Sequence, residues 1–145
     1  MDLDRLIDFY QGLTPDSLRH LPEFYSADAY FKDPFNEVRG VAAIQGIFAH
    51  MFRQVDAPRF VITERLVDAH GSMLSWEFRF QSRGWGRGQT QCIRGVSHLK
   101  YAADGKIDYH RDYWDAAEEL YMKLPLLGGL LRCLRSAFAC RPARV

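Results

Sequence analysis

The chain has 145 residues, of which 48% are hydrophobic and 26% charged, the composition of one globular domain rather than of a disordered or fibrous chain. The 19 Lys and Arg residues nearly balance the 18 Asp and Glu residues, so a net charge of +1 offers no field to hold a nucleic acid. Cys92, Cys133 and Cys140 show no paired spacing, and the acidic start Met1–Asp4 is unlike a secretory signal, so we expect a cytoplasmic protein with reduced thiols and no membrane span.

The N-terminal part of the chain predicts three helices and one short strand. Apolar residues recur three or four positions apart over Leu3–Leu13, which predicts a helix with one apolar face. The same spacing predicts a second short helix over Leu18–Tyr25, interrupted at Pro22 because proline has no amide hydrogen to donate. Tyr30–Asp33 is expected to be a short strand. Val41–Val55 is the clearest helix, since its apolar residues keep the helical period throughout.

The central part of the chain changes to strand patterns. Trp76, Phe78 and Phe80 alternate with polar residues, which indicates a sheet with one buried face. Short turns separate the strands, so we expect them to lie antiparallel, as a meander. Helices followed by such a meander predict an α+β domain in which a curved sheet wraps around the helices. The four expected strands are 60–69, 73–82, 89–102 and 106–114.

The last part of the chain predicts a helical tail. Asp115 is in the position of a helix N-cap, and the helix that it begins is interrupted at Pro125. Leucines then recur at helical spacing, and no acidic residue follows Glu119. Residues 123–145 are therefore expected to form a basic amphipathic tail on the domain of residues 1–122, not a separate domain.

Four short motifs follow one another along the chain. Phe24–Phe35 contains a tyrosine, small and acidic residues, a short strand and then Asp-Pro-Phe. Gly40 precedes the long helix, Asp104–Ile107 precedes the last strand, and that strand ends at Tyr113–Trp114. In order and spacing these motifs resemble the nuclear transport factor 2-like superfamily, also called SnoaL-like, and most closely its ketosteroid isomerases. The resemblance covers about residues 3–118.

The resemblance implies a cone-shaped α+β roll, in which a curved mixed or antiparallel sheet wraps around the N-terminal helices and encloses a pocket. We expect a homodimer formed through the outer sheet face, because a face so rich in aromatic residues needs a cover. We expect residues 123–145 to close the open end of the cone; weak contact with an anionic membrane surface is the alternative. The superfamily includes isomerases, cyclases, epoxide hydrolases, binding proteins and scaffolds, so the fold alone leaves the function open.

Two positions match the catalytic residues of the isomerases, and at a third position this chain has a different residue. Asp33 takes the place of the general base that removes a proton from the carbon next to a carbonyl group. With one residue deleted, Tyr10 takes the place of the tyrosine that donates to the developing enolate. Where the isomerases have a protonated aspartic acid, counted back from Asp104, this chain has Ser97, which donates a weaker hydrogen bond. The structural alternatives are that Asp33 starts a turn and that Tyr10 belongs to the apolar helix face.

The last strand offers a replacement for the missing acid. His110, Asp112 and Trp114 alternate, so their side chains face the same side of the sheet. In the isomerases the corresponding tryptophan lines the pocket, which implies that Asp112 supplies the second acid and that His110 tunes it or relays protons. A buried polar pair, or a pair that faces a dimer partner, is the alternative.

The expected function is that of a cofactorless isomerase or cyclase acting on an apolar carbonyl compound of steroid, polyketide or lipid type. A non-catalytic module that binds an apolar ligand or assembles as a dimer is the alternative. A third is epoxide hydrolase-like activation of water by Arg94, Arg111 and Asp112, although alternation turns Arg111 away from Asp112. The histidines lack metal-ligand spacing, so we expect no metal and no cofactor. The expected pocket walls are Phe31, Phe48, Phe52, Trp76, Phe78, Ser97 and Trp114.

Overall fold

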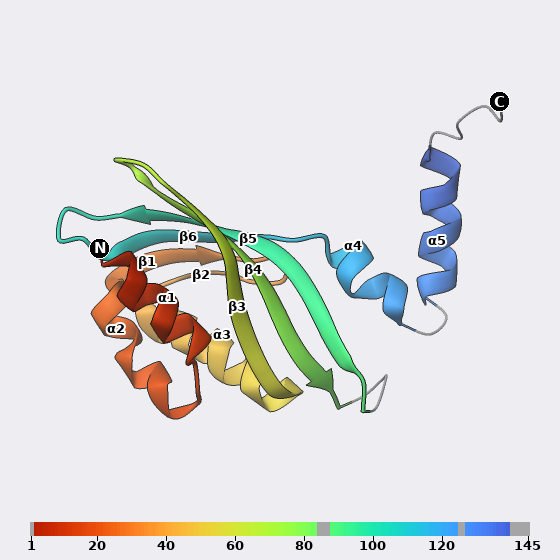
Figure 1. The fold of residues 1–145 in the computed structure, drawn as a ribbon, viewed down its shortest axis with the longest axis horizontal. Helices are drawn as coiled ribbons and strands as arrows, with labels where there is room; N and C mark the ends of the chain where they lie inside the picture. Colours follow the sequence, from red (N-terminus) through yellow and green to blue (C-terminus); the bar gives the residue numbers. More distant parts are fainter. Residues whose placement is uncertain (1, 84–87, 125–126, 140–145) are drawn as a thin grey trace. The chain divides into compact units, whose positions relative to one another are not determined.

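The computed structural model describes residues 2–83, 88–124 and 127–139 (Figure 1). The chain divides into two units, Met1–Trp114 and Asp115–Val145, and each is described by itself. The elements of the first unit are α1 (Leu3–Gln11), the 3-10 helix η1 (Asp16–His20), α2 (Leu21–Phe24), β1 (Tyr25–Lys32), β2 (Glu37–Arg39), α3 (Val41–Gln54), β3 (Val55–Val67), β4 (Gly71–Ser82), β5 (Thr90–Tyr101) and β6 (Ile107–Tyr113).

The N-terminal segment forms one regular helix followed by two short helical turns. The Asp2 carboxylate caps the first turn of α1, which places Leu6 and Tyr10 on a buried face and confirms the helix predicted over residues 3–13. The second predicted helix is wrong at its end, because Tyr25 has an extended backbone and begins β1. Pairing with β6 stabilises this extended conformation, and it outweighs the local helical spacing.

A six-stranded mixed sheet packs against α1, α2 and α3, which Figure 1 shows together on its concave side. The strand order is β2-β1-β6-β5-β4-β3, and all neighbours are antiparallel except β1 and β6, which run parallel. The predicted α+β fold and the β3–β6 meander are confirmed. The sequence pattern misses β2, whose three residues are too few to show alternation. The β1–β6 pair places Phe31 directly beside His110.

The face of the sheet that meets the helices is apolar. Trp76, Phe78 and Phe80 of β4 are buried there, as their alternation predicts. Gly95 of β5 lies against the Trp76 indole, because a Cβ atom at this position would be 2.5 Å from two ring carbons. A glycine therefore lets the indole lie flat across β5. Other side chains buried in this unit include Leu6, Leu21, Phe24, Tyr25, Phe31, Ile44, Leu74, Leu99 and Ile107.

The opposite face of the sheet carries rings and charges. Tyr30 stacks on Tyr109 with ring centroids 5.3 Å apart, and the rings of His98 and Tyr109 meet edge to face. The ammonium group of Lys100 lies 5.1 Å from the centre of the Tyr109 ring. The homodimer through this face stays a prediction.

The second unit is helical and contains α4 (Ala116–Glu119), the 3-10 helix η2 (Tyr121–Lys123) and α5 (Leu127–Phe138). The Asp115 carboxylate accepts hydrogen bonds from the first amides of α4, so the predicted N-cap is confirmed. α5 leaves Leu130, Leu134 and Phe138 exposed. Residues 84–87 of the predicted turn, and 125, 126 and 140–145 of the predicted tail, lie outside the described residues. No helix in the described part of the chain is long and apolar enough to span a membrane.

Candidate functional site

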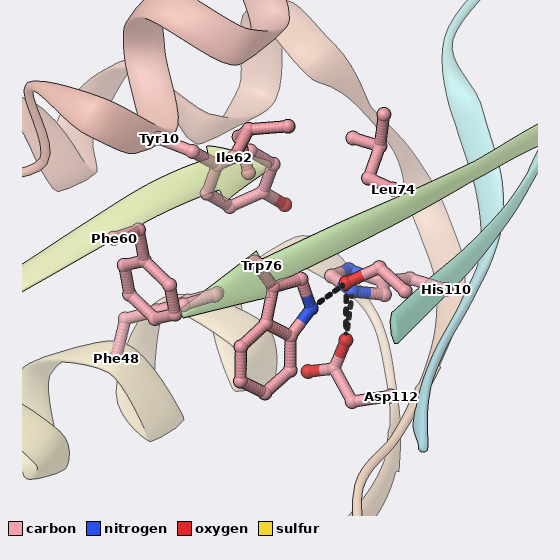
Figure 2. Close-up of a pocket in the computed structure, with 9 residues that line it drawn as sticks. Tyr10, Phe48, Phe60, Ile62, Leu74, Trp76, His110 and Asp112 are labelled. Carbon is pink, nitrogen blue, oxygen red and sulfur yellow. Dashed lines mark hydrogen bonds and ion pairs between the residues drawn. The ribbon is translucent and has the colours of Figure 1, made fainter. Parts of the chain in front are cut away.

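A small cavity lies between the helices and the concave face of the sheet. It has an empty volume of about 330 Å³, counting space open to solvent. Six elements of the first unit supply its walls, namely α1, α3, β3, β4, β5 and β6, so residues distant in sequence meet here. The lining residues are Tyr10, Phe48, Phe60, Ile62, Leu74, Trp76, Ser97, His110 and Asp112 (Figure 2).

One carboxylate, that of Asp112, lies in this largely apolar wall. Asp112 is directly opposite Ser97 in the β5–β6 pair, so the two side chains project from the same face. Ser97 Oγ donates to Asp112 Oδ1 over 2.5 Å, and His110 Nε2 lies 2.8 Å from the same oxygen. Trp76 Nε1 donates to Ser97 Oγ over 2.9 Å and so completes the arrangement.

The two oxygens of Asp112 differ in their surroundings. Oδ1 accepts both hydrogen bonds, whereas Oδ2 accepts none from the described residues. Figure 2 shows Oδ2 turned away from the two donors. The Asp112 side chain is 17% exposed and that of His110 only 2%. The carboxylate is thus held in place through one oxygen, and the Asp112 side chain lines the cavity.

Two buried tyrosines extend this network from the other ring nitrogen of His110. Tyr25 Oη lies 2.5 Å from His110 Nδ1, and the hydroxyl groups of Tyr25 and Tyr10 are hydrogen-bonded to each other. Burial raises the pKa of Tyr10, opposed by its hydrogen bond with Tyr25 and reinforced by the charge of Asp112. Burial also raises the pKa of Tyr25. Both phenols therefore keep their protons at neutral pH.

A family model described as the SnoaL-like domain matches residues 6–110, which include eight of the nine lining residues. The chain belongs to the SnoaL-like family. The predicted family is thereby confirmed, and the match spans the whole SnoaL-like fold from α1 into β6. Comparison of this SnoaL-like protein with curated proteins finds no match.

Solved structures share the SnoaL-like fold at low sequence identity. A protein with a ketosteroid isomerase-like fold from Catenulispora acidiphila, in complex with trimethylamine, is 15% identical with a TM-score of 0.68, covering 83% of this chain and 89% of that one. A protein from Jannaschia sp. CCS1 that carries the name SnoaL-like polyketide cyclase is 17% identical, with a TM-score of 0.66 and coverage of 97% and 90%. An epoxide hydrolase of M. tuberculosis is 15% identical, with a TM-score of 0.64 and 92% coverage of both chains.

The SnoaL-like cavity brings together several residues expected from the sequence. Tyr10, Ser97, His110 and Asp112 meet in one hydrogen-bonded network, and Phe48 and Trp76 supply two of the expected apolar walls. Sequence reasoning misses Tyr25, which lies within the quoted Phe24–Phe35 motif but is assigned to a helix end. It also misses three apolar lining residues, namely Phe60, Ile62 and Leu74.

Four of the expected wall residues lie outside the cavity lining. Phe31 is fully buried behind it, and its ring meets the His110 ring edge to face with centroids 4.8 Å apart. Phe78 stacks on the lining residue Phe60, with ring centroids 4.6 Å apart. Phe52 packs at the edge of the main core, and Trp114 packs against Phe35. These side chains support the lining of the SnoaL-like cavity and do not form its surface.

Asp33 is also outside the lining residues. It follows β1, and its carboxylate accepts hydrogen bonds from Phe35 N at 2.7 Å and Asn36 N at 2.6 Å. Asn36 Nδ2 donates to both of its oxygens as well. These are the contacts of an aspartate that starts a turn, and they occupy the carboxylate. The role of Asp33 as general base stays a prediction.

The arginines of the epoxide hydrolase hypothesis point away from the cavity. Arg94 forms an ion pair with Glu77 on the outer face, and the Arg111 guanidinium lies 4.6 Å from the centre of the Tyr113 ring. Neither lines the cavity. Among the described residues, no cluster of three or more His, Cys, Asp or Glu side chains could hold a metal ion.

Proposed function

We propose that this SnoaL-like protein moves a proton at a carbon next to a carbonyl group of a small apolar molecule, with Asp112 as the general base. The observation that carries the proposal is the asymmetry of Asp112, whose Oδ1 is held by Ser97 and His110 while Oδ2 accepts no hydrogen bond from the described residues. Three of the solved neighbours carry the names isomerase, polyketide cyclase and epoxide hydrolase, and the first two are compatible with this chemistry.

The proposed reaction begins at Asp112. Oδ2 takes a proton from the carbon next to the carbonyl group, and the electrons of the broken C–H bond move to the carbonyl oxygen as an enolate. The protonated carboxyl group then returns the proton to a different carbon of the conjugated system, which completes an isomerisation. Hydrogen bonds to Oδ1 fix the orientation of the carboxylate, whose side chain is 17% exposed.

Tyr10 is the proposed donor to the enolate oxygen. It lines the same cavity, and Figure 2 shows its hydroxyl oxygen among the lining side chains. Tyr10 is buried, and a hydrogen bond to a developing negative charge is stronger in such a low-dielectric environment. Removal of one such donor in other enzymes slows the reaction by about 10²–10³.

The substrate class follows from the polarity of the cavity. The walls are aromatic and aliphatic apart from Tyr10, Ser97, His110 and Asp112. We therefore propose a small apolar ketone or aldehyde that can form an enolate.

The alternative proposal is a binding module without catalysis. It is supported by the hydrogen bonds among the polar side chains of the site, which satisfy one another as in a purely structural network. These side chains are Tyr10, Tyr25, Trp76, Ser97, His110 and Asp112. In this case the cavity holds an apolar ligand and Asp112 completes the hydrogen bonding of the core.

Deuterium exchange of a probe ketone separates the two proposals. 2-Tetralone, a two-ring ketone with acidic protons next to its carbonyl group, is incubated with the protein in D2O and followed by NMR. We expect exchange faster than with the same concentration of acetate, loss of that acceleration in Asp112→Asn, and its retention in Asp33→Asn. Loss in Asp33→Asn alone would restore Asp33 as the base. Binding without accelerated exchange would support the binding module.

A further inference from the structure

Three hydrogen bonds connect Tyr10, Tyr25, His110 and Asp112 in one line. Each bond holds one hydrogen, and each of the two phenols has only one hydrogen to give. The direction of the bonds is therefore coupled along the whole line. We infer that the protonation state of His110 decides whether the Tyr10 hydroxyl donates to the ligand or only accepts from it, with Tyr25 as the positioning residue that transmits the change.

The neutral form of His110 leaves Tyr10 without a hydrogen for the ligand. Ionised Asp112 only accepts, so His110 Nε2 carries the hydrogen of the 2.8 Å bond. Nδ1 of a neutral imidazole is then an acceptor, and it takes the Tyr25 hydrogen across 2.5 Å. Tyr25 Oη in turn accepts the Tyr10 hydrogen. The Tyr10 oxygen presents only lone pairs to the cavity.

A second proton on the His110 imidazole reverses the direction of the hydrogen bonds to Tyr25 and Tyr10. Both ring nitrogens of a cationic imidazole donate, so Nδ1 gives its hydrogen to Tyr25 Oη. Tyr25 then donates to Tyr10 Oη, and the Tyr10 hydrogen is released for an acceptor in the cavity. The result is the same if the added proton lies between His110 and Asp112, because Nδ1 must still donate.

Three titratable side chains surround the His110 ring. The titratable groups of the described residues that face the ring are Asp112 from β6, Tyr25 from β1 and Tyr10 from α1, whose ring centroid is 6.3 Å away. Phe31 of β1 covers the ring with an edge-to-face contact. Asp112 is the charged member of this group, and it accepts the hydrogen bond from His110 Nε2.

The inference narrows the ligand class of the proposed function, and it rests on that function for the position of the ligand. With cationic His110, the site selects an acceptor oxygen such as that of a ketone, an aldehyde or an enolate. With neutral His110, the same cavity no longer offers a donor at Tyr10. A ketone and the matching hydrocarbon should therefore respond differently to pH.

The test compares 2-tetralone, labelled with 13C at its carbonyl carbon, with the hydrocarbon tetralin. Histidine NMR follows His110 over about pH 5–9, the range in which histidines ordinarily change charge. Infrared spectroscopy follows the carbonyl stretch of the bound ketone, and calorimetry measures both affinities. We expect the stretch to move to lower frequency and 2-tetralone to bind about tenfold tighter as His110 gains its proton, with tetralin unaffected.

Tyr25→Phe is the decisive variant because it keeps the ring and removes the link. Tyr10 then has no internal acceptor for its hydrogen, so we expect the low-frequency stretch and tight ketone binding at all pH values, while His110 still titrates. An unchanged pH response in Tyr25→Phe would overturn the inference. So would a stretch that stays constant while His110 titrates, or a His110 that never changes charge in this range.

These outcomes differ from those that test the proposed function. A pH-dependent stretch without deuterium exchange would leave the inference intact and remove the catalytic role of Asp112. Deuterium exchange together with a carbonyl stretch that does not change with pH would support the catalytic role of Asp112 and overturn the inference. Failure of both tetralone and tetralin to bind would overturn the ligand site itself, and the inference with it.

Discussion

Ser97 and Asp112 face each other across the β5–β6 pair, and the serine hydroxyl donates to the carboxylate over 2.5 Å. By resemblance, Ser97 occupies the position of the second acid of the ketosteroid isomerases, and Asp112 is the acid that this chain carries beside it. The serine also accepts the indole hydrogen of Trp76, so it orients both the acid and a wall of the cavity.

Replacement of Ser97 by alanine should therefore destabilise the protein. It leaves the buried indole N–H of Trp76 without its acceptor and removes one donor from Asp112, at a combined cost of about 1–3 kcal/mol in the free energy of unfolding. Urea denaturation measures this change. The matched control is Ser26→Ala, because the buried Ser26 hydroxyl has no hydrogen-bond partner among the described residues and its loss should be neutral or stabilising. Equal losses in both variants would contradict the prediction.

Asp33→Ala should reduce stability and leave proton transfer intact. The variant loses the acceptor of two backbone amides and of the Asn36 side chain, which should cost about 1–2 kcal/mol. Asp33→Asn keeps one acceptor oxygen and should lose less. Thermal unfolding and the exchange rate of 2-tetralone, measured on the same samples, test both statements. A variant of full stability and no exchange activity would make Asp33 the base.

Gly95→Ala should disturb the cavity through Trp76. The added Cβ atom would meet the indole ring at 2.5 Å, so the ring must shift, which disturbs its hydrogen bond with Ser97. We expect weaker binding of 2-tetralone and a changed tryptophan fluorescence spectrum. Gly46→Ala is the control, because a Cβ atom there has open space within 4 Å and lies inside α3, where alanine should stabilise by about 1 kcal/mol. Unchanged fluorescence in Gly95→Ala would show that the packing is looser than described.

The protein should lose stability above about pH 10. Burial raises the pKa of Tyr10 and Tyr25 in the folded state, so the unfolded chain releases these protons first as pH rises. The stabilisation is complete below about pH 10, the ordinary tyrosine value, and falls above it by up to about 1.4 kcal/mol per pH unit for each group. Unfolding free energies between about pH 8 and 11 should decline less steeply in Tyr25→Phe. Tyr113→Phe, at a half-exposed position, should keep the original slope.

The exposed apolar residues of α5 predict a weak association with anionic membranes. Leu130, Leu134 and Phe138 are exposed, and the sequence contains no acidic residue after Glu119. We expect the full chain, but not residues 1–124, to co-sediment weakly with vesicles that contain phosphatidylserine. Leu134→Glu should weaken this association. Equal sedimentation of all three proteins would contradict it, and a rise in apolar dye binding on truncation would favour the role of a cover for the cavity.

Local patterns predict the parts of this fold that depend on local contacts. The alternation along β4 identifies the buried face, and the turn at Asp104–Gly105 places Ser97 close to Asp112, since a short hairpin fixes the register of β5 and β6. The β1–β6 contact is different, because it joins strands from opposite ends of the unit and leaves no local pattern. Tyr25 is missed for this reason, as its residue spacing also fits a helix.

Asp33 is a residue whose role the sequence alone leaves open. An aspartate before proline is compatible with a general base that faces a pocket and with the first residue of a turn. In the second case its carboxylate accepts hydrogen bonds from backbone amides nearby in sequence. The nearby amides of Phe35 and Asn36 supply those donors. By contrast, the spacing of His110 and Asp112 requires a shared face, so their proximity follows from strand geometry alone.

The position of β6 between β1 and β5 has a consequence for biosynthesis. β6 is the last strand of the sheet to leave the ribosome, yet it occupies the interior of the strand order. Until it emerges, β1 has no partner on that side, and neither His110 nor Asp112 is present. The apolar face of the nascent sheet therefore stays incompletely packed through most of translation. The complete sheet and the cavity can form only together, once β6 has emerged.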